Sequence, residues 1–87
     1  MLFIVHFEVK PENRDKSFQR FEKGGDVPPG NEHIGVWFAA SQLEGWALVK
    51  SDIAVALGKY MHAWTDLNVN TVTPLLEPKE LEAVFEA

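Results

Sequence analysis

The sequence predicts an α+β domain whose elements follow the order strand, helix, strand, strand, helix, strand. An apolar, β-rich opening segment precedes a helical one, and two further β-rich segments flank a short polar loop. A second helical segment, with the clearest apolar periodicity in the chain, leads into a last β-rich segment. The 87 residues leave room for one domain. We place it at residues 1–76, followed by an acidic helical tail at residues 77–87.

The first strand is predicted over Leu2–Val9, which is almost continuously apolar and stops before Pro11. Apolar residues occupy both faces of this segment, a pattern typical of a strand that is buried on both sides. A signal peptide has basic residues before its apolar segment. Here no basic residue precedes the apolar segment, and His6 and Glu8 interrupt it early. We therefore expect a strand and a cytoplasmic protein.

The first helix is predicted over Glu12–Lys23, where Phe18 and Phe21 form a short apolar stripe. Gly24-Gly25 is expected to end it, because glycine readily adopts the left-handed conformation found after helices. The segment Asp26–Glu32 contains two prolines and a glycine and predicts a turn region.

A β-hairpin is predicted from Ile34–Ala40 and Gly45–Lys50, joined by a four-residue loop, Ser41–Glu44. This loop length would place Ala40 opposite Gly45 and Trp37 opposite Leu48. Trp37, Ala39, Trp46 and Leu48 would then share one face, and Ile34, Val36, Phe38, Ala40, Ala47 and Val49 the other.

The second helix is predicted to begin at Asp52, a residue type that commonly caps helices. Its apolar stripe runs at 4-3-4-3 spacing through Ile53, Leu57, Tyr60, Trp64 and Leu67. The fourth strand is predicted over Val69–Leu76, where Pro74 suits a sheet edge. Pro78 can start a short C-terminal helix with Leu81, Val84 and Phe85 on one face.

This order is that of a ferredoxin-like fold, with the first and third strands at the centre of an antiparallel sheet. Both faces of the hairpin are apolar, yet two helices can cover only one face of a four-stranded sheet. We therefore expect a homodimer in which the uncovered faces of two copies pack together about a twofold axis.

Composition excludes several partners. The formal charge is −5 and basic residues are not clustered, which disfavours nucleic acid, including recognition by an RNA-binding domain of the same strand order. No apolar run is long enough to span a membrane. The chain has no cysteine, and His6, His33 and His62 show no i, i+4 pairing, so no metal site is predicted.

Four segments resemble the dimeric α/β-barrel superfamily, and within it a family of short single-domain proteins of unknown function. They are Met1-Leu2-Phe3-Ile4-Val5, Val36-Trp37-Phe38, Trp64-Thr65-Asp66-Leu67 and Val72-Thr73-Pro74-Leu75. Wider relatives include cofactor-free monooxygenases, muconolactone-type isomerases and haem-binding enzymes. The resemblance implies a flat or cyclic ligand held between the sheet and the helices. No cofactor is predicted, because the first strand lacks the Asn of the haem degraders and His62 lies away from the apolar stripe.

Five residues are the candidate site. His6 is expected as a catalytic proton-transfer residue, because it is a polar group on a central strand and titrates near neutral pH. Trp37, Trp46, Tyr60 and Trp64 are expected to bind the ligand around one cavity. The first hypothesis is a small-molecule-binding dimer, with a cofactor-independent monooxygenase or isomerase activity among the candidates. The alternative is a non-catalytic sensor or structural dimer in which the same residues fill the core.

Overall fold

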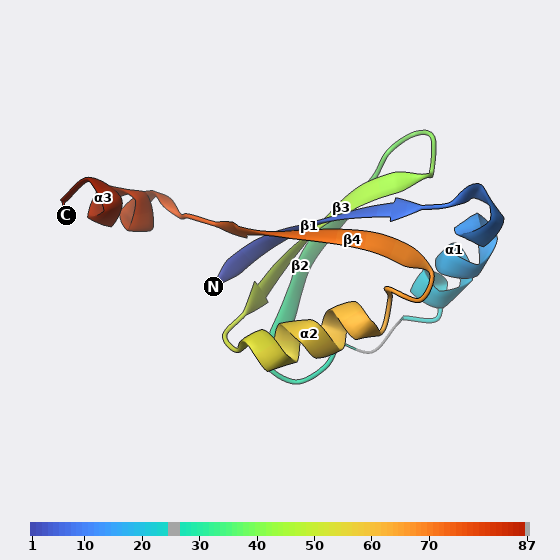
Figure 1. Ribbon diagram of the computed structural model, residues 1–87, viewed down its shortest axis with the longest axis horizontal. Helices are drawn as coiled ribbons and strands as arrows, with labels where there is room; N and C mark the ends of the chain where they lie inside the picture. The colour runs from blue at the N-terminus through green and yellow to red at the C-terminus, as the bar shows by residue number, and fades with distance from the viewer. Residues whose placement is uncertain (25–26, 87) are drawn as a thin grey trace.

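The structure is a computed structural model that describes residues 1–24 and 27–86. Its elements are β1 (Leu2–Val9), a 3₁₀ helix (Pro11–Asn13), α1 (Arg14–Glu22), β2 (Asn31–Phe38), β3 (Glu44–Ser51), α2 (Ala54–His62), β4 (Asn68–Leu75) and α3 (Pro78–Glu86). The predicted α+β class, the ferredoxin-like element order and the short C-terminal helix are confirmed. Figure 1 shows α1 and α2 on the same side of the sheet, and the four strands with these two helices form the body of the domain.

The four strands form one antiparallel sheet in the order β2-β3-β1-β4. β1 and β3 are therefore central and the other two are edge strands, as predicted. Pro74 lies within β4. Because β4 is an edge strand, proline, which has no backbone N–H to donate, is tolerated at this position. In the part of the chain that the structure describes, the sheet has one face covered by helices and one face without a helix.

α1 packs on the sheet through aromatic side chains. Phe18 and Phe21 contact Phe38 of β2, with ring centroids 5.5 and 5.3 Å apart, and Phe7 of β1 joins the same cluster. The helix ends at Glu22 with Lys23 as its C-cap, and Gly24 follows with a φ of 66°, in the left-handed region that glycine adopts without strain. The expected contributions of Gly25 to the helix end and of Asp26 to the turn lie outside the described residues.

β2 begins at Asn31, three residues before the predicted start, because Asn31 and Glu32 pair with Ser51 and Lys50 of β3. A register shift lies between His33 and Gly35. The bulge takes Ile34 out of the alternation, so its predicted place on the face of Val36 is wrong and its side chain is 49% exposed. The predicted turn region therefore extends too far, because Asn31 and Glu32 already belong to β2, as does His33.

The hairpin pairs Trp37 with Trp46 and Phe38 with Gly45. The predicted pairing of Trp37 with Leu48 is therefore wrong. Residues 39–43 separate the two strands, and the N–H of Ala39 donates to the carbonyl of Glu44 at 2.9 Å, so the loop itself runs from Ala40 to Leu43. The shift changes each partner by two residues, so Trp37, Trp46 and Leu48 stay on their predicted face, opposite to Val36 and Ala47. Gly45 permits this pairing because a Cβ there would lie 2.5 Å from the carbonyl oxygen of Trp37 and would overlap the ring of Phe7.

α2 is shorter than its apolar stripe predicts. Ile53 occupies the N-cap position, so the expected cap by Asp52 is wrong, and the Asp52 carboxylate instead lies 3.5 Å from the N-terminal amine. The helix ends at His62, and Trp64 and Leu67 lie in the turns that lead to β4. The stripe nevertheless continues inward, because Trp64 packs against the core.

The hydrophobic core lies between the sheet and α2. Val5, Val49 and Tyr60 are its buried centre, with exposures of 2%, 1% and 9%. Ala47, Leu57, Met61, Trp64 and Val72 pack around them. Burial of these side chains supplies the main driving force for folding the domain.

α3 lies outside this body. Figure 1 shows it beyond the end of β4, at the extremity of the molecule and away from α1 and α2. None of the helices in the described ranges is long and apolar enough to cross a membrane.

Candidate functional site

A cavity of about 300 Å³ lies between the covered face of the sheet and the two helices. Its floor is built by the inward-facing side chains of the sheet, and its walls by Phe18 and Phe21 of α1 and Tyr60 and Met61 of α2. The floor comprises Val5, Phe7, Val9, Val36, Phe38, Ala47 and Val49. The cavity is therefore mostly apolar and suits a molecule that loses little by leaving water.

Polar side chains enter this cavity from β4. Asn68 is buried and accepts a 3.0 Å hydrogen bond from the hydroxyl of Ser17 in α1. Asn70 donates to the sulfur of Met61 at 3.4 Å, but its carbonyl oxygen is buried without a partner among the described residues. An unpaired buried acceptor costs about 1–3 kcal/mol, so a donor from a bound molecule would relieve an existing penalty.

Tyr60 and Trp64 line the same cavity. Burial raises the pKa of the Tyr60 phenol above its ordinary value, so the group remains a neutral O–H at physiological pH. The structure thus brings two of the five predicted site residues together. Tyr60 and Trp64 also belong to the hydrophobic core. The same two side chains therefore fit both hypotheses, core packing and ligand binding.

An ion pair connects α1 to the turn after α2 at one end of the cavity. Both terminal nitrogens of Arg20 in α1 donate to the carboxylate of Asp66, at 2.6 and 2.9 Å, and Nη1 also donates to the carbonyl of Ala63 at 2.8 Å. The guanidinium carbon lies 5.8 Å from the ring centroid of Trp64. The Arg20 hydrogen bonds lower the pKa of Asp66, and the same contact raises the pKa of Arg20. Asp66 therefore ties α1 to the turn after α2.

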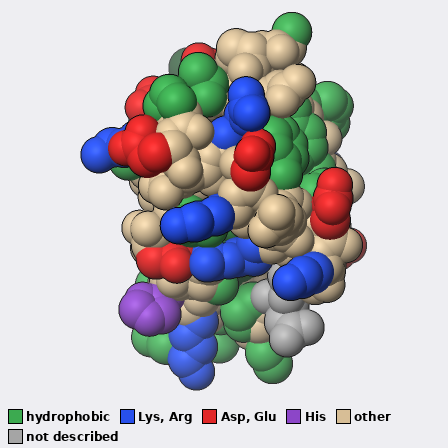
Figure 2. All heavy atoms as spheres, turned by 90° about the vertical axis from the view of Figure 1, so that its right-hand side faces the viewer, with side chains coloured by type: hydrophobic (Ala, Val, Ile, Leu, Met, Phe, Trp, Pro, Cys, Tyr) green, Lys and Arg blue, Asp and Glu red, His purple; other side chains and the backbone are tan. Residues whose placement is uncertain are grey.

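This end of the molecule is polar. Figure 2 views it directly and shows acidic and basic side chains intermixed on the surface around α1. The side chains of Arg20 and Asp66 are 36% and 58% exposed, so the strength of their ion pair is limited by water and salt.

The remaining three predicted site residues lie on the other side of the sheet. His6, Trp46 and Trp37 occupy one row across β1, β3 and β2, and none of them lines the cavity. The expectation that all five residues surround one cavity is therefore wrong. The sheet itself separates His6 from Tyr60 and Trp64, because successive residues of a strand point to opposite faces.

We call this second surface the open face and define it by Ile4, His6, Trp37, Trp46 and Leu48. The His6 ring stacks on Trp46 with centroids 5.3 Å apart, and its Nε2 lies 3.3 Å from a carboxylate oxygen of Glu44. Trp37 and Trp46 remain 56% and 38% exposed. Aromatic side chains with this exposure form an apolar patch of the kind that marks an association surface.

Several polar residues of the cavity were missed in the sequence. Asn70 lies within the predicted fourth strand without a distinct signal, and Asn68 precedes the predicted start of that strand, at Val69. In the structure β4 begins at Asn68, so the spacing of two places both side chains on the same face. His33 also lines the cavity, whereas His62 is exposed on α2, away from the core, as its helical position predicts. Within residues 1–24 and 27–86, no group of three or more metal-ligating side chains is present.

Comparison with known proteins places the chain in a family without assigning an activity. No curated protein and no solved structure matches it. Residues 1–87 match one family over the whole length of the chain. The chain therefore belongs to the family described as a domain of unknown function, DUF3303.

Proposed function

We propose that this chain forms a homodimer and that each copy binds a compact planar or cyclic molecule in the cavity between its sheet and helices. The observation that carries the proposal is the unpaired carbonyl oxygen of Asn70 in a mostly apolar cavity. The ligand class that fits is a mainly hydrocarbon molecule with one hydrogen-bond donor.

The size and lining of the cavity support this class. Ligand sites typically occupy about 300–1,000 Å³, are mostly apolar and carry a few polar groups that fix orientation. The present cavity, at about 300 Å³, is at the small end of that range and suits a one- or two-ring molecule. Tyr60 and Asn68 add a neutral hydroxyl and an amide to its polar groups.

The arrangement favours binding over the proton transfer expected of His6. The His6 ring is on the opposite face of the sheet from the cavity, so it cannot reach a molecule held by Tyr60 and Trp64. Around the cavity, Ser17, Asn68 and Asn70 can orient a ligand through hydrogen bonds. In the open face, His6 instead packs its ring against that of Trp46.

The homodimer rests on the open face. Ile4 and Leu48 are only partly covered, while Trp37 and Trp46 are exposed beside them. A second copy presents the same apolar surface, so two copies related by a twofold axis can cover one another's open faces. Each cavity then lies on the outer side of its sheet, accessible without separating the copies.

Calorimetric titration with 1-naphthol and naphthalene tests the ligand class. The two probes have the same ring system, but only naphthol carries a hydroxyl that can donate to Asn70. We expect naphthol to bind at least about tenfold more tightly, because a buried acceptor is satisfied only by that probe. Asn70→Leu should abolish the difference between the probes while retaining the binding of naphthalene.

A matched pair of variants locates the site. Ala47→Leu fills space in the cavity and should weaken the binding of both probes, whereas Ala40→Leu adds the same atoms to the exposed hairpin loop and should not. If neither probe binds to the folded protein, or if Ala47→Leu has no effect, the proposed ligand site is wrong. The alternative, a structural dimer with a filled core, would then be favoured.

A further inference from the structure

α3 carries an apolar stripe that the body of the same chain does not cover. Leu81, Val84 and Phe85 lie at helical spacing and are 44%, 55% and 79% exposed. Glutamates flank this stripe on either side. The helix is therefore amphipathic, and its apolar side faces solvent in the single chain.

A helix of this length needs a packing partner. α3 has 9 residues, whereas isolated helices shorter than about 12–15 residues are marginal in water. The stabilising contact must therefore come from the surface that its apolar stripe meets.

The connection from β4 directs α3 away from its own body. Only Leu76 and Glu77 separate the strand from Pro78, the first residue of the helix. A residue before proline is restricted to extended conformations, so Glu77 continues the direction of β4 instead of reversing it. Figure 1 shows the result, with α3 beyond the end of the sheet.

The dimensions of the chain show how much surface this arrangement leaves uncovered. Its accessible surface is 6150 Å², about 1,000 Å² more than a compact monomer of its mass exposes. Its radius of gyration is 14.3 Å, against about 12 Å for a compact domain of this length. The excess surface resembles the roughly 800 Å² that each partner buries in a standard protein interface.

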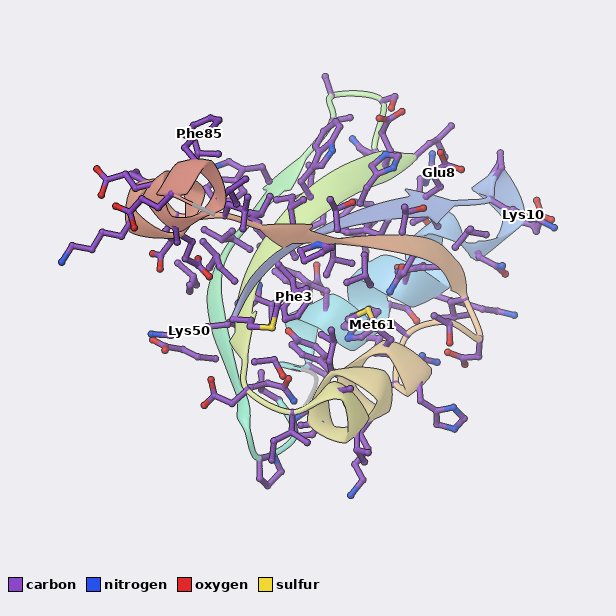
Figure 3. All side chains as sticks on the ribbon, turned by 60° about the vertical axis from the view of Figure 1, so that its left-hand side comes forward. Phe3, Glu8, Lys10, Lys50, Met61 and Phe85 are labelled. Atoms are coloured by element: carbon purple, nitrogen blue, oxygen red, sulfur yellow. The ribbon has the colours of Figure 1, made fainter. Side chains whose placement is uncertain are left out.

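We infer that α3 is an arm that packs its apolar stripe against a second copy of this chain. In Figure 3 Phe85 lies on the side of α3 that is turned away from α2, which is also the side of the open face. One partner can therefore cover the open face and the stripe together. The inference rests on the homodimer proposed above and adds a specific contact to it: each copy clasps the other through residues 78–86.

Sedimentation equilibrium of the full chain tests the arm through a matched pair of variants. Phe85→Glu places a charge in the apolar stripe, while Ala83→Glu adds the same charge to the opposite side of α3. We expect Phe85→Glu to raise the dissociation constant of the dimer about tenfold or more, because the charge would be desolvated in the interface. Ala83→Glu should leave the constant unchanged.

An isotope-filtered NMR experiment identifies the surface that α3 contacts. A mixed dimer of methyl-labelled and unlabelled chains should show contacts from the methyls of Leu81 and Val84 to protons of the other copy. A dimer that shows only contacts within one chain, or that is insensitive to Phe85→Glu, would overturn the arm while leaving the homodimer intact. A monomer would overturn both.

Discussion

The two faces of the sheet differ in how deeply their side chains are buried, although the same strands supply both. On the covered face Val5 and Val49 are almost fully buried beneath α2. On the open face their immediate neighbours in sequence, His6 and Leu48, remain partly exposed beside Trp46. Successive residues of a strand point to opposite faces of the sheet. One residue therefore stabilises the single chain, and the next is available for association. We therefore expect substitutions on the covered face to affect folding, and substitutions on the open face to affect the proposed association.

The largest effect is expected on the covered face. Val49→Asp would place a carboxylate where the native side chain is 1% exposed. Burial of an unpaired charge costs several kcal/mol. This cost is comparable with the whole free energy of unfolding of a typical domain, about 5–15 kcal/mol. We expect the variant to be largely unfolded by circular dichroism. A folded variant with native stability would contradict the position of the core.

The neighbouring residue on the open face should respond differently. Leu48→Asp should retain the fold but raise the dissociation constant of the dimer roughly 100-fold, because a charge would be desolvated between two sheets. Sedimentation equilibrium measures this change, with Ser41→Asp in the exposed hairpin loop as the control. If both variants associate like the unmodified chain, the open face is not the interface.

The sequence predicts most of this contrast, because the assignment of most side chains to the two faces remained correct although the predicted strand pairing was wrong. The pairing of Trp37 with Leu48 was wrong, yet both side chains lie on the predicted face. The bulge at Ile34 could not be predicted, because one extra residue in a strand leaves no distinct apolar pattern. The end of α2 was also missed, because Trp64 continues the apolar stripe after the helix has ended.

The site was less predictable than the fold for one physical reason. Alternation shows which residues share a face, but both faces of β1 and β3 are apolar, so the pattern does not say which face the helices cover. His6 and Trp46 were therefore combined with Tyr60 and Trp64, although a sheet lies between them. Asn70 carried no signal in the sequence, since its unpaired carbonyl becomes apparent only when its neighbours are in place.

A smaller effect on the covered face should appear in alkali. Burial raises the folded-state pKa of Tyr60 above its unfolded value of about 10. Its contribution to stability is thus fully present below pH 10 and is lost as the pH rises through the folded-state pKa. Tyr60 is the one tyrosine of the sequence, so tyrosinate absorbance reports its titration directly. Tyr60→Phe should remove this part of the alkaline loss of stability, and an ordinary pKa for Tyr60 would contradict its burial.

The smallest effect is expected at the exposed Arg20–Asp66 pair. The hydrogen bonds from Arg20 lower the folded-state pKa of Asp66, so the stabilisation is present above the unfolded value of 3.8 and is lost as the pH falls through the lower, folded-state value. Asp66→Asn should lower the melting temperature at neutral pH by only about 1–2 °C, because exposed ion pairs contribute little. It should also flatten the acid limb of the stability profile. A large loss of stability would instead show that this pair anchors the core.

The most direct test of the division between the two faces is sedimentation equilibrium of the unmodified chain at micromolar concentration. Because the open face and the α3 stripe are apolar and uncovered in one copy, we predict a particle of twice the 9.8 kDa chain mass. A stable particle of 9.8 kDa would contradict the assignment of the open face to association.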